Sequence, residues 1–198
     1  MKGSSPIAEH AEGEIAIAVL AAGKGSRFGG GKLDAALRGK PLGRWITQSA
    51  EQAGFSRRIV IVGQSAPNFI QNLSDWDVVE NPDAEEGMGT SIAAAAKAAQ
   101  GCTRLVIALA DMPRVSAGHL RNIASQSAIV FTAYPDGHAG VPAAFPTRCL
   151  PRLAKLSGTK GAASIGWEEG IQLFPPPDYG ELDDVDTLEA LERLRIKP

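Results

Sequence analysis

Short runs of apolar residues recur along this chain, and they restrict its fold more than any other feature. They occupy residues 15–20, 59–62, 105–109 and 128–133, are rich in Ile, Val and Leu, and are bounded by Gly, Ser, Pro or Asp. The runs do not alternate apolar with polar residues, so each predicts a strand that is covered on both faces. Strands of this kind are typical of a mostly parallel sheet.

The stretches between these runs have helical character. Helices are predicted over residues 42–53, 91–99, 116–125 and 186–195. The alternation of strands and helices is typical of an α/β fold, here a three-layer α/β/α, Rossmann-like domain with a mostly parallel mixed sheet and right-handed crossovers. In such sheets ligands bind beyond the carboxyl ends of the strands, where we expect the functional residues.

Length and charge limit the organisation of the chain and its partners. With 198 residues, the chain is long enough for one well-buried core, and residues 15–198 are expected to form a single domain. Residues 1–14 are small and polar without periodicity, which predicts a flexible leader. The 20 Lys and Arg residues are balanced by 22 Asp and Glu residues, so the sequence favours no nucleic-acid partner.

The sequence also indicates a soluble, cytoplasmic protein without a membrane partner. No apolar stretch approaches the roughly 20 residues that span a bilayer. Glu9, Glu12 and Glu14 precede the first apolar run, where an export signal carries positive charge. Cys102 and Cys149 are far apart and lie outside any CxxC or His-rich sequence, which favours buried thiols over a disulfide scaffold or a zinc site.

A glycine-rich loop, LAAGKGSRFGGGKL at residues 20–33, follows the first apolar run. It begins like the dinucleotide motif GxGxxG, but Phe28 stands at the third glycine. A phosphate-binding Walker loop is excluded, because Ser26 stands at its first glycine and Leu33 at its Ser or Thr position.

The remaining physical content of the loop suits a triphosphate. Its backbone N–H groups can approach an anion closely, Arg27 offers a bidentate guanidinium, and Lys32 offers a point charge. Taken alone, the loop is equally consistent with a surface turn whose charges are solvated.

The loop resembles the opening signature LAAG-x-G-x-R-[FM]-G…K of the nucleotidyltransferase (nucleotide-diphospho-sugar transferase) family. Four later segments resemble its molybdenum cofactor cytidylyltransferase branch in the same order: NPDAEEGMGTS at 81–91, LADMP at 109–113, GVP at 140–142 and DVDT at 184–187. The resemblance covers residues 15–195. It implies a Mg²⁺-dependent enzyme that transfers CMP from CTP to the phosphate of molybdopterin and releases pyrophosphate.

The resemblance also implies roles for individual residues. Nucleotidyl transfer brings two anions together, so positioning and charge neutralisation dominate its catalysis. Arg27 and Lys32 correspond to residues that contact the triphosphate, and Lys32 would stabilise charge on the α-phosphate; Lys24 lies at a variable position and is expected to face water. The nucleotide is expected to contact Leu20, Ala21, Ala22 and Gly23 on one side and Asn81, Gly87 and Ser91 on the other. Ser91 is also a candidate N-cap of the following helix.

Aspartates supply the predicted metal site. Asp111 ends the run RLVIALAD, which places it at the carboxyl end of a central strand, and it is the first predicted Mg²⁺ ligand. A turn or N-cap role is its structural alternative. Asp184 is the second predicted ligand, with Asp186 as its alternative; the two share a face of an extended segment, and Asp186 or Asp184 could instead cap the last helix.

The identity of the two substrates depends on fewer residues. Ala22 gives the LAAG of cytidylyl-transferring members, whereas guanylyl-transferring members show LAGG, so CTP is favoured over GTP. On the acceptor side, Val141 stands where the branch has His, while His138 is interpreted as a surface residue. Thr159 and Ala163 replace the Asp and Arg of the branch's GDxGAR segment.

These departures leave two other functions open. One is nucleotidyl transfer to another phosphorylated small molecule. The other is a nucleotide-binding accessory protein without turnover that assists the maturation of a molybdenum enzyme, such as a molybdenum hydroxylase.

Overall fold

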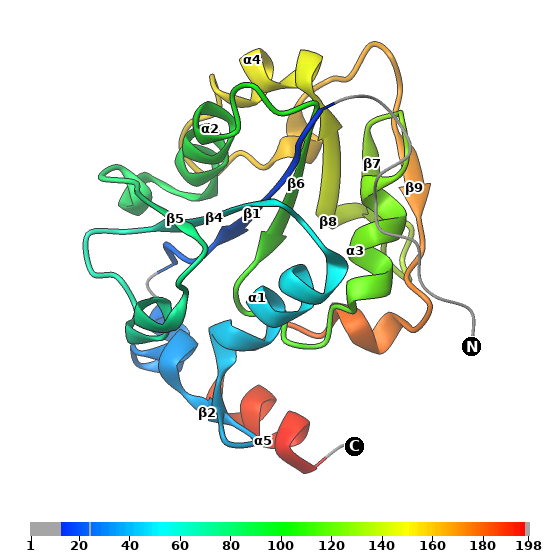
Figure 1. Cartoon of the computed structure of the whole chain (residues 1–198). Coiled ribbons are helices and arrows are strands. Elements are labelled where there is room, and N and C mark those ends of the chain that lie inside the picture. The colour runs from blue at the N-terminus through cyan, green and yellow to red at the C-terminus, as the bar shows by residue number, and fades with distance from the viewer. Residues whose placement is uncertain (1–12, 24, 197–198) are drawn as a thin grey trace.

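A seven-stranded sheet forms the centre of the computed structural model, which describes residues 13–23 and 25–196 (Figure 1). The strand order is β5-β4-β1-β6-β8-β7-β9. β8 pairs antiparallel with β6 and β7, and the other neighbours pair parallel. The predicted mostly parallel mixed sheet is therefore confirmed. The strands are β1 (Ile15–Leu20), β4 (Arg57–Val62), β5 (Asp77–Glu80), β6 (Arg104–Leu109), β7 (Val130–Ala133), β8 (Ala139–Pro146) and β9 (Gln172–Phe174).

Helices cover both faces of this sheet, as a three-layer domain requires. In Figure 1, α1 and α3 lie on one face and α2 and α4 on the other. In the described part of the chain, no helix is both long and apolar enough to cross a bilayer. The helices are α1 (Leu42–Ala53), α2 (Met88–Ala98), α3 (Ala117–Ala124), α4 (Leu150–Leu153) and α5 (Leu188–Ile196).

Two hydrophobic cores flank the sheet and explain the apolar runs. Ile17 and Val19 of β1 belong to the core under α1 and α3. Ala16 and Ala18, which alternate with them, belong to the core under α2 and α4. Since successive residues of a strand point to opposite faces, a strand between two cores must be apolar throughout.

The strand order creates a switch point beside β1. The chain leaves β1 for β4 and β5 on one side of it and then returns to β6 on the other side. The carboxyl ends stay bonded to one another, because Ala21 N–H donates to Ile61 O (2.8 Å) and Ala110 N–H donates to Leu20 O (3.0 Å). Ligands of open α/β sheets bind at such a point.

The Gly-Val-Pro sequence at residues 140–142, one of the segments that resemble the cytidylyltransferase branch, lies within β8. Pro142 has no N–H to give to a ladder, and the pairing of β7 with β8 shifts register there, between Phe131 and Thr132. Thr132 Oγ1 donates to Pro142 O (2.6 Å), which satisfies the carbonyl in this irregular stretch.

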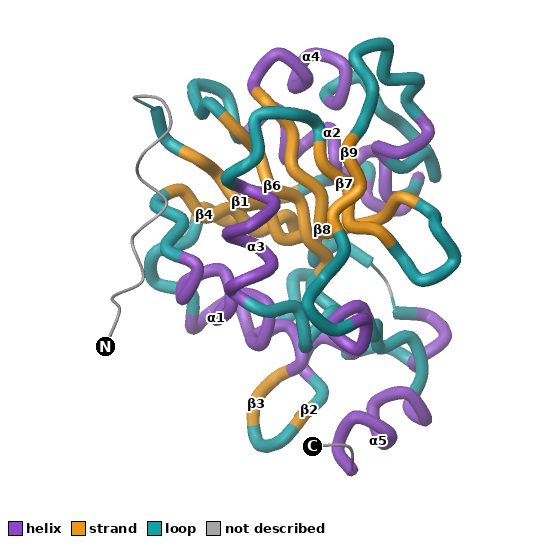
Figure 2. Tube along the Cα trace, turned by 90° about the vertical axis from the view of Figure 1, so that its right-hand side faces the viewer, coloured by secondary structure: helices purple, strands orange, loops and turns teal. Residues whose placement is uncertain are grey.

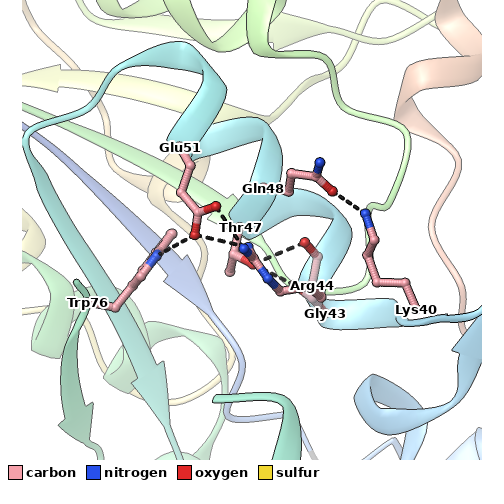
Figure 3. Close-up of polar contacts among 7 residues, drawn as sticks. All are labelled: Lys40, Gly43, Arg44, Thr47, Gln48, Glu51 and Trp76. Atoms are coloured by element: carbon pink, nitrogen blue, oxygen red, sulfur yellow. Dashed lines mark hydrogen bonds and ion pairs between the residues drawn. The ribbon is translucent and has the colours of Figure 1, made fainter. Parts of the chain in front are cut away.

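One side of helix α1 carries an ion pair within the helix and a hydrogen bond from Trp76 (Figure 3). Arg44 donates to both carboxylate oxygens of Glu51 (3.0 and 2.8 Å), and Trp76 Nε1 donates to Glu51 Oε1 (3.1 Å). Burial acts to raise the pKa of Glu51, but these hydrogen bonds outweigh it and hold the pKa below its usual value. Near the start of α1, Lys40 donates to Gln48.

The last helix contacts a two-stranded hairpin, β2 (Ala36–Leu37) with β3 (Lys40–Pro41), which Figure 2 shows beside α5. Arg195 Nη2 donates to Ala36 O (2.6 Å). Because this hairpin directly follows the glycine-rich loop, its contact with α5 brings the residues before α5 close to that loop.

Candidate functional site

The glycine-rich loop turns back over the carboxyl edge of the sheet and is anchored at both ends. It contains two 3₁₀ helices, Ser26–Phe28 and Lys32–Asp34. Phe28, which replaces the third glycine of a dinucleotide motif, is buried in the core. Gly31 has φ = 63°, a left-handed conformation that favours glycine, and it precedes Lys32 directly. Lys24 lies outside the described residues, as do residues 1–12 of the predicted leader.

Lys32 joins two acidic segments that are far apart in the sequence. Its Nζ donates to Asp111 Oδ2 (2.6 Å) and to Asp186 Oδ1 (3.0 Å), and its side chain is only 10% exposed. Burial acts to lower the pKa of Lys32, but Asp111 and Asp186 outweigh it and raise the pKa above its usual value. The ammonium therefore stays charged between the two carboxylates.

A backbone hydrogen bond holds the second acidic segment against the first. Val185 is buried, and its N–H donates to Asp111 O (3.0 Å), which places Asp184 and Asp186 on either side of this contact. Desolvation raises the pKa of Asp184, and the negative charges of Asp186 and Asp111 raise it further. Three carboxylates therefore lie close enough to repel one another.

The capping alternatives for two of these aspartates are wrong. Asp186 does not cap α5, because Ala190 N–H donates to Thr187 Oγ1 (3.2 Å), while Asp186 faces Lys32. Nor does Asp111 cap α3, whose N-cap is Ser116; its hydroxyl accepts the N–H of His119 (3.1 Å).

The predicted magnesium ligands fit a hard divalent cation. Asp111 Oδ1 is buried and has no hydrogen-bond partner among the described residues, so one carboxylate oxygen is free to bind an ion. Within residues 13–23 and 25–196, no group of three or more His, Cys, Asp and Glu side chains is arranged to hold a metal. Magnesium needs no such group, because it keeps several waters and takes one or two carboxylates. The assignment of Asp111 and Asp184 as ligands stays a prediction.

Two adjoining clefts, of about 460 and 280 Å³, open beside Lys32. Ala21, Ala22, Gly23 and Lys32 line both of them. The smaller cleft gathers most of the predicted site, since it is also lined by Leu20, Gly87, Ser91 and Asp111.

Two predicted nucleotide contacts, Arg27 and Asn81, do not line these clefts. The side chain of Arg27 is 80% exposed, and its Nη1 lies 3.6 Å from Asp186 Oδ2. Asn81 is buried behind the cleft, where its Nδ2 donates to Ser91 Oγ (3.0 Å) and Thr90 Oγ1 (2.9 Å). Asn81 therefore holds the first turn of α2, which carries Ser91. The N-cap alternative for Ser91 is wrong, because α2 begins at Met88.

The larger cleft is lined by a segment that the sequence analysis missed. Residues 63–67, which follow β4, form one of its walls. Asp34, the last residue of the second 3₁₀ helix, accepts the N–H groups of Asn68 and Phe69 (both 2.8 Å) and fixes the end of this segment. The position of the segment, at the carboxyl end of a predicted strand, was the signal that could have found it.

The sequence analysis also missed Tyr134. Its hydroxyl donates to Val141 O (2.9 Å), and its ring stacks on His138 with 4.2 Å between ring centroids. Burial, followed by the charges of Asp184 and Asp111, raises the pKa of Tyr134 to about 12, so its hydroxyl stays protonated at neutral pH. His138 itself is a surface side chain that lines neither cleft and pairs with Asp136.

The segment that contains Thr159 packs against the start of α2, beside Gly87, which lines the smaller cleft. Gly89 N–H donates to Gly158 O (2.8 Å), and a Cβ on Gly87 would lie 2.5 Å from the same oxygen. Only glycines allow this approach between the start of α2 and residues 157–160. Thr159, one of the departures, is therefore beside a wall of the smaller cleft.

Comparisons with known proteins find similar sequences over most of the chain. The family described as MobA-like NTP transferase domain matches residues 17–169. The purine catabolism protein PucB of Bacillus subtilis (strain 168) is 29% identical over 194 residues, which cover 89% of this chain and 93% of PucB. Nicotine blue oxidoreductase of Paenarthrobacter nicotinovorans is 28% identical over 191 residues, or 89% of this chain and 94% of that protein.

Solved structures superimpose on nearly the whole chain. The crystal structure of Rv0371c from Mycobacterium tuberculosis H37Rv superimposes with a TM-score of 0.81 at 27% identity, and the match covers 95% of this chain and 100% of that one. A structure of Rv0371c in complex with manganese has a TM-score of 0.74 at 27% identity and covers 93% and 100% of the two chains.

Proposed function

Because this chain belongs to the family of MobA-like NTP transferase domains, which match it over residues 17–169, we propose that it transfers CMP from CTP to the phosphate of molybdopterin. One observation carries this proposal. Lys32 lies between Asp111 and Asp186 at two clefts that the LAAG segment also lines, so a phosphate-binding cation and metal-binding carboxylates meet beside a nucleotide-sized space.

The choice of CTP is supported by the wall of the clefts. Ala22 lines both clefts and carries a methyl group where guanylyl-transferring proteins of similar sequence have glycine. Less space remains there for a purine, which favours the smaller pyrimidine base. Backbone groups of residues 20–23 would hold the base and ribose.

The chemistry requires a phosphate of the acceptor to attack the α-phosphorus of CTP. A P–O bond to the acceptor forms, the P–O bond to the β-phosphate breaks, and its electron pair leaves with pyrophosphate. Lys32 neutralises the charge that grows on the α-phosphate, and Arg27, at the exposed rim, holds the outgoing phosphates.

A magnesium ion held by Asp111 and Asp184 would supply charge neutralisation and orientation of the phosphates when bound. Rv0371c, which is 27% identical, has been solved in complex with manganese, and this supports the proposal that the present chain binds a divalent cation. Val185 contributes through its backbone, since its N–H keeps the two aspartates at one place.

The acceptor is proposed to enter beside residues 157–160, which contact the start of α2. With Thr159 and Ala163 in place of two charged residues, this side relies on other groups for recognition. The names of PucB and nicotine blue oxidoreductase link proteins of similar sequence to catabolism and oxidoreductases. We therefore propose a cytoplasmic molybdenum hydroxylase as the enzyme that receives the product.

Pyrophosphate release tests the proposal. The protein is incubated with Mg²⁺, each of the four NTPs in turn and either molybdopterin or a sugar phosphate as acceptor, and the product is identified by mass spectrometry. Release with CTP and a pterin product one CMP heavier supports the proposal. Release with GTP alone changes the donor, and release only with a sugar phosphate changes the acceptor. Tight CTP binding without pyrophosphate release in the presence of any acceptor identifies an accessory protein instead.

A further inference from the structure

The ammonium of Lys32 lies against the same carboxylates that are expected to hold a metal ion. It contacts Asp111 Oδ2 and Asp186 Oδ1 at 2.6 and 3.0 Å, and its side chain is nearly buried. Asp111 is also the first predicted metal ligand. One of its two oxygens is therefore already bound to a cation of the protein, and the other has no partner in the described residues.

Charge opposes the presence of both cations on these carboxylates. A divalent ion bound to Asp111 would stand within a few ångströms of the Lys32 ammonium, and two like charges so close in a partly buried site repel strongly. Without the ammonium, the carboxylates of Asp111 and Asp186, whose oxygens both lie within 3.0 Å of Lys32 Nζ, would repel one another. The nucleotide-free protein resolves this repulsion with its own lysine.

A triphosphate changes this balance. It brings several negative charges to the clefts that Lys32 lines, so the ammonium gains an alternative anionic partner. The Arg27 side chain can also turn towards the triphosphate, because its contact with Asp186 is long, at 3.6 Å, and its side chain is 80% exposed.

The movement this requires is small. Lys32 has a flexible four-carbon stem, and the larger cleft beside it offers about 460 Å³. A change of rotamer therefore suffices to turn the ammonium from the carboxylates towards a bound phosphate, with the backbone of the loop fixed by Phe28 and Leu33 in the core.

We propose that Lys32 holds the place of the divalent cation in the nucleotide-free protein, and that nucleotide binding draws it away, so that metal and nucleotide bind cooperatively. This inference rests on the proposed function, because it assumes that the clefts accept an NTP. Linkage makes the effect reciprocal: the factor by which the nucleotide raises metal affinity equals the factor by which the metal raises nucleotide affinity.

Metal binding without nucleotide tests the inference. Mn²⁺ is titrated into the wild type, Lys32→Met and Lys40→Met, and free Mn²⁺ is followed by electron paramagnetic resonance. Lys32→Met keeps an apolar side chain of similar length and removes the charge, so its Mn²⁺ affinity is expected to exceed that of the wild type by roughly tenfold or more. Lys40→Met, which removes a lysine bonded to Gln48, is expected to bind Mn²⁺ as the wild type does.

Two further variants keep the result interpretable. Lys32→Met with Asp111→Asn should lose the gain, which would locate the tighter site at Asp111. If Lys32→Met does not fold, Lys32→Gln replaces it, and the increase in melting temperature caused by Mn²⁺ provides a second readout. Equal or weaker Mn²⁺ binding by the lysine variant than by the wild type overturns the inference. Because no transfer takes place in this assay, tighter binding by a protein that releases no pyrophosphate would support the inference and reject the proposed function.

Discussion

At the scale of single residues, Asp111 makes two separate kinds of contact. Its backbone carbonyl accepts the N–H of Val185, and its carboxylate accepts the ammonium of Lys32. The first contact positions the acidic segment, and the second belongs to the site. A substitution of the Asp111 side chain therefore removes the carboxylate from the site but keeps the backbone hydrogen bond from Val185.

Asp111→Asn is expected to lower kcat/KM for pyrophosphate release by about a hundredfold or more, because it removes the charge that would hold the metal. The melting temperature should stay close to that of the wild type, since the backbone bond from Val185 remains. Asp77→Asn is the control, because it removes an aspartate that pairs with Arg57 (3.2 Å) on an edge strand. An Asp111→Asn variant with full activity would exclude it as a metal ligand.

Arg104 is a buried residue with a purely structural role. Its Nη2 donates to the carbonyls of Ile123 (3.3 Å), Ala128 (2.7 Å) and Ala144 (3.4 Å), which joins α3, β8 and the start of β7. Burial lowers the pKa of Arg104 to about 10, so the guanidinium remains charged at neutral pH.

Removal of this guanidinium leaves buried carbonyls without a donor. Arg104→Met is expected to lower the free energy of unfolding by about 2–4 kcal/mol, measured by urea denaturation. Arg148→Met is the matched control, since its side chain is 57% exposed and its contact with Glu169 is long, at 3.9 Å. It should change stability by less than about 0.5 kcal/mol. Equal effects of the two variants would contradict a special role for Arg104.

The sequence predicted which residues meet better than it predicted how they are held. The meeting of Lys32 with Asp111 followed from two local signals, a glycine-rich loop after one strand and an aspartate at the end of another. Ser91 and Asp186 were ambiguous, because Ser and Asp are common caps as well as functional residues. Tyr134 carries no local signal, since its position depends on the pairing of β7 with β8.

At the scale of elements, the start of α2 depends on its contact with residues 157–160. A Cβ on Gly89 would lie 2.7 Å from Ser157 O and 2.9 Å from Gly158 O, which is closer than real Cβ atoms approach a backbone. Gly87, which precedes α2, and Ser91, in its first turns, both line the smaller cleft. Any shift of the start of α2 therefore reaches the proposed nucleotide site.

Gly89→Ala is therefore expected to lower the free energy of unfolding by about 1–3 kcal/mol and to weaken CTP binding, measured by isothermal titration calorimetry. Gly161→Ala is the control from the contacting segment, because a Cβ there meets nothing within 4 Å and its φ is negative, at −84°. The control should bind CTP as the wild type does. Unchanged CTP affinity in Gly89→Ala would show that the start of α2 does not shape the nucleotide site.

The elements that the sequence predicted are those that its local pattern defines. α1 has the predicted bounds, and β1, β4 and β6 contain the apolar runs from which they were predicted. The short edge strands β5 and β9 were not predicted, because their residues are mostly exposed and their pairing partners lie far away in the sequence. The apolar residues of β8 were obscured by its Gly-Val-Pro start.

At the scale of the whole molecule, hydrogen bonds through the sheet connect one of its helical layers to β8. His119 of α3 is buried, and its ring contacts Thr132 Oγ1 (2.8 Å) of β7. Since Thr132 gives its own proton to Pro142 O, His119 Nε2 is assigned as the donor in this contact. His119 Nδ1 is then an acceptor, and it is buried without a partner among the described residues.

This arrangement makes the stability of the molecule depend on pH. Desolvation lowers the pKa of His119 below its usual value of 6.5, and the charge of Glu181 opposes this effect only in part. Below pH 6.5 the unfolded chain therefore binds a proton that the folded protein excludes, so stability falls as the pH falls from 6.5 towards the folded pKa.

Urea denaturation at pH 7.5, 6.5 and 5.5 should accordingly show a decreasing free energy of unfolding, by at most about 1.4 kcal/mol per pH unit from this residue. His119→Gln keeps an amide that can donate to Thr132 but does not titrate, so its stability should depend less on pH over the same range. His138→Gln removes an exposed imidazole and should retain the wild-type dependence. If His119→Gln and the wild type lose stability equally on acidification, the buried imidazole is not the group that senses pH.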